Sequence, residues 1–271
     1  MKPLNCFLFT CLFITVSMRS LSQEDTWDVY LAQYEKGVGS TVINMSAKSK
    51  APVAGLPYIL IIGVKYSDCQ EDGFPTKKMF EVLYKVSDSV QALIGRTVKN
   101  NFVGTFTYQC ERVDYVYVND TTVLRQKLEE LYKKHFAGLE SIITIKEDKQ
   151  WEAYTDFLYP NEETYEYMKN EKVVRNLVEE GDKLDKSRNV DHWLYFPTEK
   201  DRNCFITYAG INKFKIDAKD KVENIQMPFR LKISRIDKVD LPAITSITLE
   251  LQKQAKSCNG DYDGWETVVV K

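Results

Sequence analysis

The first half of the chain mixes short apolar segments of strand length with two helical patterns. Residues 27–30, 40–45 and 58–64 are rich in β-branched and aromatic side chains, which is typical of strands. After Thr76 the apolar residues recur with helical spacing as far as Gly95, so Thr76 is predicted to cap a helix. Further strands are predicted at 102–108, 113–118, 141–145 and 151–157, and a second helix ends near Gly138. This half is therefore expected to be an α/β domain with its own core.

The second half follows the order strand, helix, strand, strand, helix, strand. Residues 188–196 alternate apolar and polar side chains, and Thr198 with Asp201 resembles a helix-capping pair. Residues 229–234 alternate in the same way, which indicates a strand with one wet face, and Asp240 opens the second helix. The order is that of a ferredoxin-like domain, an antiparallel four-stranded sheet with two helices on one face.

A highly charged stretch separates the two halves. Its apolar residues Val173, Val174, Leu177 and Val178 form the stripe of a single helix. We therefore expect an α+β protein of two domains. The expected boundaries are 23–158 for the first domain, 159–181 for a linking helix and 182–271 for the ferredoxin-like domain.

The N-terminus has the pattern of a secretory signal. Lys2 precedes an apolar run at 7–16, and Ser20-Leu21-Ser22 offers small residues for cleavage. The run is too short to span a bilayer, which needs roughly 20 apolar residues. We expect a signal peptide at 1–22, no transmembrane segment and export to the periplasm. The alternative is a buried N-terminal segment of a cytoplasmic protein.

Composition and charge argue against several classes. Of 271 residues, 44% are hydrophobic and 28% are charged, which suits folded domains. The chain has 37 Lys and Arg against 39 Asp and Glu, and removing Lys2 and Arg19 leaves 35 against 39, a net charge of -4. A mildly acidic chain has no general attraction for nucleic acid.

Four cysteines remain after the predicted cleavage: Cys69, Cys110, Cys204 and Cys258. None forms a C-x-x-C pair, and the chain has only 2 histidines, so we predict no metal site and no cofactor. Cys204 lies near the start of the first C-terminal helix and Cys258 at the end of the second. Antiparallel helices would place these ends together, so a disulfide after export is predicted, with two buried free thiols as the alternative.

The sharpest candidate for chemistry combines Asp191 and His192 with Asp261, Asp263 and Glu266. A histidine beside carboxylates could act as a general base, so a hydrolase-type enzyme centred on His192 is the alternative function. However, neighbouring residues on a strand point to opposite faces, so His192 on the apolar face favours a hydrogen-bonded core histidine.

Aromatic residues near the same strands favour a binding surface. Trp193, Tyr195, Tyr262 and Trp265 could anchor a protein partner, since Trp and Tyr are favoured at interfaces. The alternative is that the first domain or the linking helix packs on them and hides them.

Three segments carry a family resemblance: Gly181-Asp182, the run 188–196 and the run 260–266. Over roughly residues 170–271 the chain resembles the regulator of ribonuclease E activity B (RraB) family. Residues 27–30, 56–58 and 72–75 resemble a bacterial family of unknown function, numbered six hundred and ninety-five. The first resemblance implies a ferredoxin-like protein that acts by binding another protein, with ribonuclease E inhibition as the family's named role.

Together, these observations predict a regulatory protein that binds a protein partner rather than an enzyme. The residues do not specify which partner, and a structural role in the envelope is a further alternative. The predicted binding residues are Asp191, His192, Trp193, Tyr195, Asp261, Tyr262, Asp263, Trp265 and Glu266.

Overall fold

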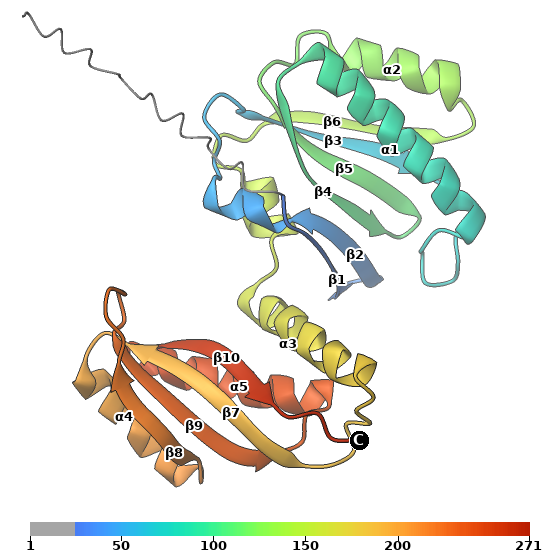
Figure 1. The fold of residues 1–271 in the computed structure, drawn as a ribbon. Helices are drawn as coiled ribbons and strands as arrows, with labels where there is room; N and C mark the ends of the chain where they lie inside the picture. The colour runs from blue at the N-terminus through green and yellow to red at the C-terminus, as the bar shows by residue number, and fades with distance from the viewer. Residues whose placement is uncertain (1–24) are drawn as a thin grey trace, which may run out of the picture.

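The computed structural model describes residues 25–271, which form two lobes connected through one helix (Figure 1). The signal peptide predicted at 1–22 lies outside the described residues. One lobe holds a six-stranded sheet and the other a four-stranded sheet, so the predicted two-domain α+β fold is confirmed. No helix within 25–271 combines the length and the apolar character needed to cross a bilayer.

The N-terminal lobe is built on an antiparallel sheet with the strand order β1-β2-β4-β5-β3-β6. Its strands are β1 (Trp27–Tyr34), β2 (Gly37–Asn44), β3 (Tyr58–Lys65), β4 (Asn100–Tyr108), β5 (Glu111–Val118) and β6 (Glu140–Glu147). Helices α1 (Lys77–Thr97) and α2 (Leu124–His135) pack on one face around Leu60, Ile62 and Val116. The predicted cap of α1 is confirmed, because Thr76 Oγ1 accepts a hydrogen bond from the Met79 N–H at 3.2 Å.

The opposite face of this sheet is covered by the short helices η1 (Met45–Ser49) and η2 (Ala153–Leu158). The strand predicted at 151–157 is therefore wrong. The Asp148 carboxylate accepts the N–H groups of Glu152 and Ala153 and starts a helical turn there. The Trp151 ring stacks 3.9 Å from the Tyr117 ring, so its apolar surface is buried by packing on the sheet and not by pairing within it.

The C-terminal lobe confirms the ferredoxin-like order. Strands β7 (Arg188–Phe196), β8 (Lys215–Lys221), β9 (Phe229–Asp237) and β10 (Asp261–Thr267) form an antiparallel sheet ordered β10-β7-β9-β8. Helices α4 (Glu199–Ile211) and α5 (Leu241–Ser257) lie on one face of it (Figure 1). Thr198 caps α4 and Asp240 caps α5, as predicted.

Helix α3 (Glu162–Glu179) contacts both lobes. Its Met168 is buried in the N-terminal core, whereas Val174 and Leu177 belong to a cluster with Val190 and Ile244. Val178 was predicted in the same apolar stripe, but it is 51% exposed. Successive helical residues are about 100° apart, so the face that carries Leu177 turns Val178 to the side.

Each lobe contains one disulfide bond. The predicted Cys204–Cys258 bond is confirmed and joins α4 to the end of α5. A second bond, Cys69–Cys110, links the segment before α1 to the β4–β5 turn and was not predicted.

Candidate protein-binding face of the C-terminal sheet

Strand β7 divides its side chains between two faces of the sheet. Val190, His192, Leu194 and Phe196 are each 0% exposed beneath α4 and α5. Asp191, Trp193 and Tyr195 alternate with them and are half-buried on the face that carries no helix. We call this uncovered side of the sheet the open face, and it lies toward the viewer in Figure 1.

The Trp193 ring contacts two cations of the neighbouring strand β9. Lys232 is the register partner of Trp193, and its Nζ is 4.7 Å from the ring centroid, while the Arg230 Cζ is 5.1 Å away. Such cation–π contacts contribute about 0.5–1 kcal/mol each at exposed sites. The indole of Trp193 is thus held in one position on the open face.

Carboxylates neutralise both cations. Lys232 Nζ lies 2.7 Å from Asp191 and 3.4 Å from Glu266, and the hydrogen bond that Lys232 donates to Asp191 raises the pKa of Lys232. Arg230 Nε donates to Asp220 Oδ1 at 2.9 Å, and this pairing lowers the pKa of Asp220. The two cations beside Trp193 are therefore neutralised, and Trp193 does not lie in a basic patch.

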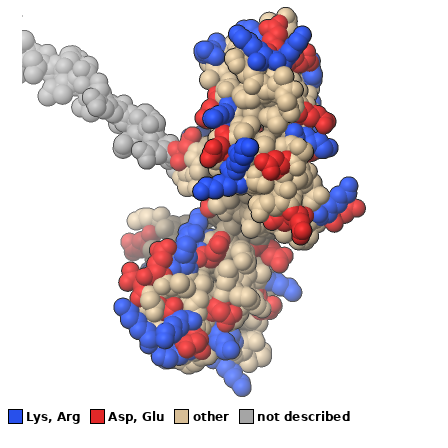
Figure 2. Space-filling model, turned by 90° about the vertical axis from the view of Figure 1, so that its right-hand side faces the viewer, with Lys and Arg blue, Asp and Glu red and all other residues tan. Residues whose placement is uncertain are grey.

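The edge strand β10 adds an acidic border to the open face. Asp261 and Asp263 are exposed, and within residues 25–271 neither has a cation at ion-pairing distance. The side chain of Glu266 is 59% exposed despite its contact with Lys232. The predicted acids thus lie along the edge strand next to β7, and charges of both signs are spread over this lobe (Figure 2).

His192 and Tyr262 lie on the other side of the sheet. The Nδ1 of His192 is 2.9 Å from the Tyr262 hydroxyl, and both side chains are buried beneath the helices. Burial is the main cause that lowers the pKa of His192 to about 3, and burial also raises the pKa of Tyr262. Asp261 and Glu266 pair with Tyr195 and Asp191 of the open face, so the sheet separates both acids from this imidazole, and the structure does not assemble the predicted centre of the alternative hydrolase.

Trp265 also faces the helix side, because its register partner is His192. Its Nε1 donates to Asn170 Oδ1 of α3 at 2.8 Å. Asn170 in turn donates to the hydroxyls of Thr245 and Thr248 of α5, at 3.2 and 2.8 Å. The linking helix therefore covers Trp265. His192, Tyr262 and Trp265 therefore do not belong to the open face, and their side chains stabilise the fold on the helix side of the sheet.

Asp182, Arg188, Gly181 and Gly260, which lie in the family-like segments, also stabilise the fold. Asp182 is ion-paired with Arg188 and accepts the N–H groups of Leu184 and Val270, at 2.8 and 2.7 Å. Gly181 has φ +91°, and a Cβ on Gly260 would lie 2.3 Å from the Phe196 ring. These positions fix how α3, β7 and the C-terminal tail meet.

Arg230, Lys232 and Asp220 belong to the open face but were missed as site residues. The alternation of apolar and polar residues at 229–234 indicated a wet face on that strand. The pairing of β9 with β7 was needed to place those cations beside Trp193.

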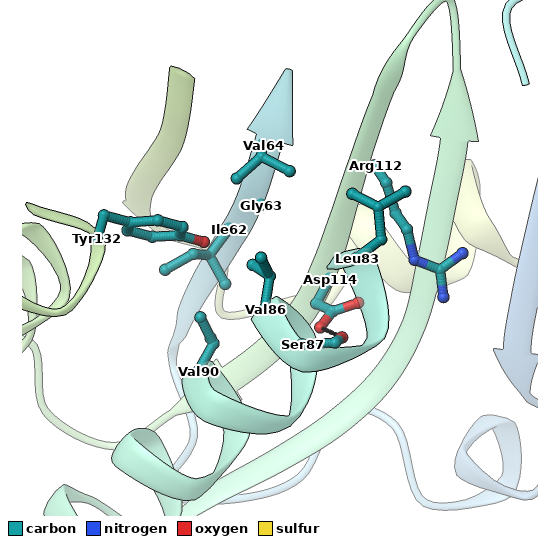
Figure 3. Close-up of a pocket in the computed structure, with 10 residues that line it drawn as sticks. All are labelled: Ile62, Gly63, Val64, Leu83, Val86, Ser87, Val90, Arg112, Asp114 and Tyr132. Atoms are coloured by element: carbon teal, nitrogen blue, oxygen red, sulfur yellow. Dashed lines mark hydrogen bonds between the residues drawn. The ribbon is translucent and has the colours of Figure 1, made fainter. Parts of the chain in front are cut away.

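A second polar cluster lies beneath α1 in the N-terminal lobe (Figure 3). The buried Asp114 carboxylate accepts hydrogen bonds from Ser87 Oγ and, at 2.7 Å, from Thr105 Oγ1, while the buried Tyr132 hydroxyl has no hydrogen-bond partner among residues 25–271. The adjoining cavity is about 10 Å³, which is the size of one water molecule. It has no room for an organic substrate.

Comparison with known families covers both lobes. Residues 168–267 match the family described as regulator of ribonuclease activity B, and residues 25–159 match a family of unknown function (DUF695). No curated protein matches the chain. At the family level the first match supports a regulatory role without catalysis. Both resemblances are thus confirmed: the C-terminal part of the chain is similar to the RraB regulators, and the N-terminal part is similar to the family of unknown function.

Proposed function

We propose that this chain is an exported regulatory protein that binds a protein partner through the open face of its C-terminal sheet. The observation that carries the proposal is the position of Trp193, whose ring contacts two cations of β9 on the sheet face opposite α4 and α5. Aromatic residues that are already ordered lose little side-chain entropy on binding, so they make effective anchors. Tyr195 lies next to Trp193 on the same face and extends the anchor.

The acids around this centre select the partner by charge. Asp261, Asp263 and Glu266 line one edge and would attract a basic complement, which increases the association rate and excludes acidic partners. Asp191 holds Lys232 in place and shapes the surface under the indole. The proposed contact residues are therefore Asp191, Trp193, Tyr195, Asp261, Asp263 and Glu266.

The disulfides support the exported setting. Both bonds join cysteines that lie far apart in the sequence, by 41 and 54 residues. Structural disulfides persist in oxidising compartments such as the periplasm and are rare in the cytosol. A partner in the same compartment follows from this placement.

Site-specific photo-crosslinking tests the proposal in cells that express the chain. A photoreactive phenylalanine analogue replaces Tyr195 on the open face and, as the matched control, Tyr208 on the helix side. We expect a crosslinked partner at position 195 alone, and we expect Trp193→Ala to abolish it. Equal crosslinking at both positions, or crosslinking that survives Trp193→Ala, would contradict the proposal.

The family description suggests a ribonuclease as one class of partner. Adding the oxidised protein to purified ribonuclease E and labelled RNA tests this class. Inhibition that disappears with Trp193→Ala would assign the ribonuclease to the open face.

A further inference from the structure

The two lobes are built on one topology. In the N-terminal lobe β3, α1, β4, β5, α2 and β6 follow one another, and the strands lie in the order β4-β5-β3-β6. The C-terminal lobe repeats this pattern from β7 to β10, with the order β8-β9-β7-β10, and neighbouring strands are antiparallel in both lobes. β3 therefore corresponds to β7 and β5 to β9, while the β1–β2 hairpin extends the N-terminal sheet beyond β4.

In the N-terminal lobe a short segment covers the face that corresponds to the open face. Helices α1 and α2 pack on the other side of the sheet, whereas Tyr115 and Tyr117 of β5 belong to the core on this side. Trp151, Tyr154 and Leu158 of the covering segment are fully buried in the same core. The N-terminal lobe thus shows what kind of segment occupies this face of the shared fold.

One stacked aromatic ring and one helical turn hold this covering segment. The Trp151 ring lies almost flat on the Tyr117 ring, with 3.9 Å between the ring centroids and 7° between the planes. The Tyr117 hydroxyl donates to Asp148 Oδ2 at 2.6 Å, and the same carboxylate accepts the N–H groups of Glu152 and Ala153. The segment therefore packs on the face of the sheet through an aromatic side chain and does not add a strand to the sheet.

The open face offers a comparable ring with free space beside it. Trp193 stands on the central strand β7, as Tyr117 stands on the central strand β5. Both cations that contact the indole belong to β9, the neighbour on one side of β7. On the other side its register partner is Gly264 of β10, where an added Cβ would meet no atom within 4 Å apart from those of its chain neighbours. We call this space beside the indole and over Gly264 the Gly264 slot.

Acidic side chains flank the Gly264 slot along β10. Asp261 pairs with Tyr195 and Glu266 pairs with Asp191, so the two acids lie on the open face on either side of the slot. Asp261 is exposed and has no cation at ion-pairing distance within residues 25–271, and the Glu266 side chain is 59% exposed. The four strand steps from Asp191 to Tyr195 span about 13 Å. Two turns of an α-helix rise by about 11–12 Å, so basic residues one turn before and one turn after an aromatic residue match the spacing of the acids.

We propose, on the basis of the proposed function, that the partner segment bound by the open face is a short helix with an aromatic residue between two basic residues. The aromatic side chain enters the Gly264 slot and stacks beside Trp193, in the manner of the covering segment of the N-terminal lobe. The basic residues, one turn before it and one turn after it, face Asp261 and Glu266. The stacked ring supplies most of the affinity, and the spacing of the charges supplies the specificity.

The test uses the full-length oxidised protein and a fluorescent, capped, alanine-based dodecapeptide that a side-chain staple holds helical. The peptide has tryptophan near its centre and an arginine four residues before and four residues after it. Fluorescence anisotropy should show saturable binding that weakens at least tenfold when the tryptophan is replaced by alanine. An isomer with the arginines two residues from the tryptophan places them on the opposite side of the helix and should bind severalfold more weakly.

Variants of the protein locate the binding. Gly264→Leu fills the slot and should weaken binding at least tenfold, as should Trp193→Ala. Gly210→Leu is the matched control and should leave binding unchanged, because Gly210 also has free space at its Cβ position but lies on α4, on the other side of the sheet. Asp261→Asn combined with Glu266→Gln should weaken binding severalfold.

Absence of saturable binding up to about 1 mM peptide would overturn the proposal. Equal binding of the tryptophan and alanine peptides to the wild-type protein would also overturn it, and this comparison does not depend on the folding of any variant. A cellular partner that still crosslinks at position 195 in Gly264→Leu would overturn the helical occupant and leave the open face as the binding surface. Absence of that crosslink without the substitution would contradict the proposed function together with this inference.

Discussion

Trp193 and Lys232 face each other across strands β7 and β9, with the Lys232 Nζ 4.7 Å from the centre of the indole ring. The contact lies on the face of the C-terminal sheet opposite α4 and α5, which no helix of residues 25–271 covers. It gives a large aromatic side chain a defined position without burying it in the core. That combination distinguishes Trp193 from Trp265, which is bonded to Asn170 beneath α3.

The buried ion pair between Asp182 and Arg188 should be essential for the C-terminal lobe. Both side chains are almost fully buried, so Asp182→Ala leaves an unpaired guanidinium and should reduce the free energy of unfolding by about 3–5 kcal/mol. Urea denaturation measures this loss. Asp185→Ala, which changes a neighbouring acid without a described ion pair, is the control and should have little effect.

The same pair should make stability depend on acidic pH. Arg188 holds the pKa of Asp182 well below its usual value, so the contribution is complete above about pH 4 and is lost as the pH falls further. Replacing Asp182 should flatten the stability profile in that range, and an unchanged profile would contradict the assignment.

His192 should add a second pH dependence at higher pH. The unfolded imidazole binds a proton near pH 6.5, whereas burial keeps the folded one neutral to about pH 3. Stability is therefore complete above pH 6.5 and falls as the pH falls, by at most about 4 kcal/mol near pH 3. NMR titration of the His192 ring measures its pKa directly, and a value near 6.5 would show that the ring is not buried as described.

The Cys204–Cys258 bond closes a long loop and should stabilise the oxidised protein. For a separation of 54 residues, the chain-entropy model gives about 4 kcal/mol, and measured values are typically 2–4 kcal/mol. The double variant Cys204→Ser/Cys258→Ser should lose that amount in urea denaturation. Mass spectrometry after thiol alkylation checks the pairing, and free thiols in protein recovered from the periplasm would contradict it.

Helix α3 should be required for folding of the C-terminal lobe. Asn170, Val174 and Leu177 pack against α5 and β10 through a buried network, so we propose that the C-terminal domain begins near residue 160. A fragment of residues 160–271 should unfold cooperatively, as followed by circular dichroism. A fragment of residues 182–271 lacks Asn170 and should not, and equal stability of the two fragments would contradict this boundary.

The ferredoxin-like order was predictable because apolar alternation at 188–196 and caps at Thr198 and Asp240 are local signals. The helical turn at 151–157 was not, since its aromatic residues have strand propensity, and the cap by Asp148 and the contact between Trp151 and Tyr117 decide their conformation. The Cys204–Cys258 bond followed from helix direction, whereas Cys69 and Cys110 are joined by loop geometry without a sequence pattern.

The candidate site was predictable only in part, for a related reason. Trp193 and Tyr195 share a face by strand alternation, which the sequence shows. Tyr262 and Trp265 point to the helix side of the sheet, opposite to Trp193 and Tyr195. Their orientation depends on the register of β10 against β7, including the irregularity between Tyr262 and Gly264. Register is a long-range property, so proximity in the family-like segment did not reveal which aromatic residues support the fold.

Quantitative affinity capture from a periplasmic extract tests the central claim most directly. Wild-type protein is compared with Trp193→Ala and with Trp27→Ala, which removes a 40% exposed tryptophan from the other lobe. We predict a partner that is recovered with wild type and Trp27→Ala and lost with Trp193→Ala, while circular dichroism shows all three folded. Undiminished recovery of the same partner with a folded Trp193→Ala variant would contradict the open face as the binding surface.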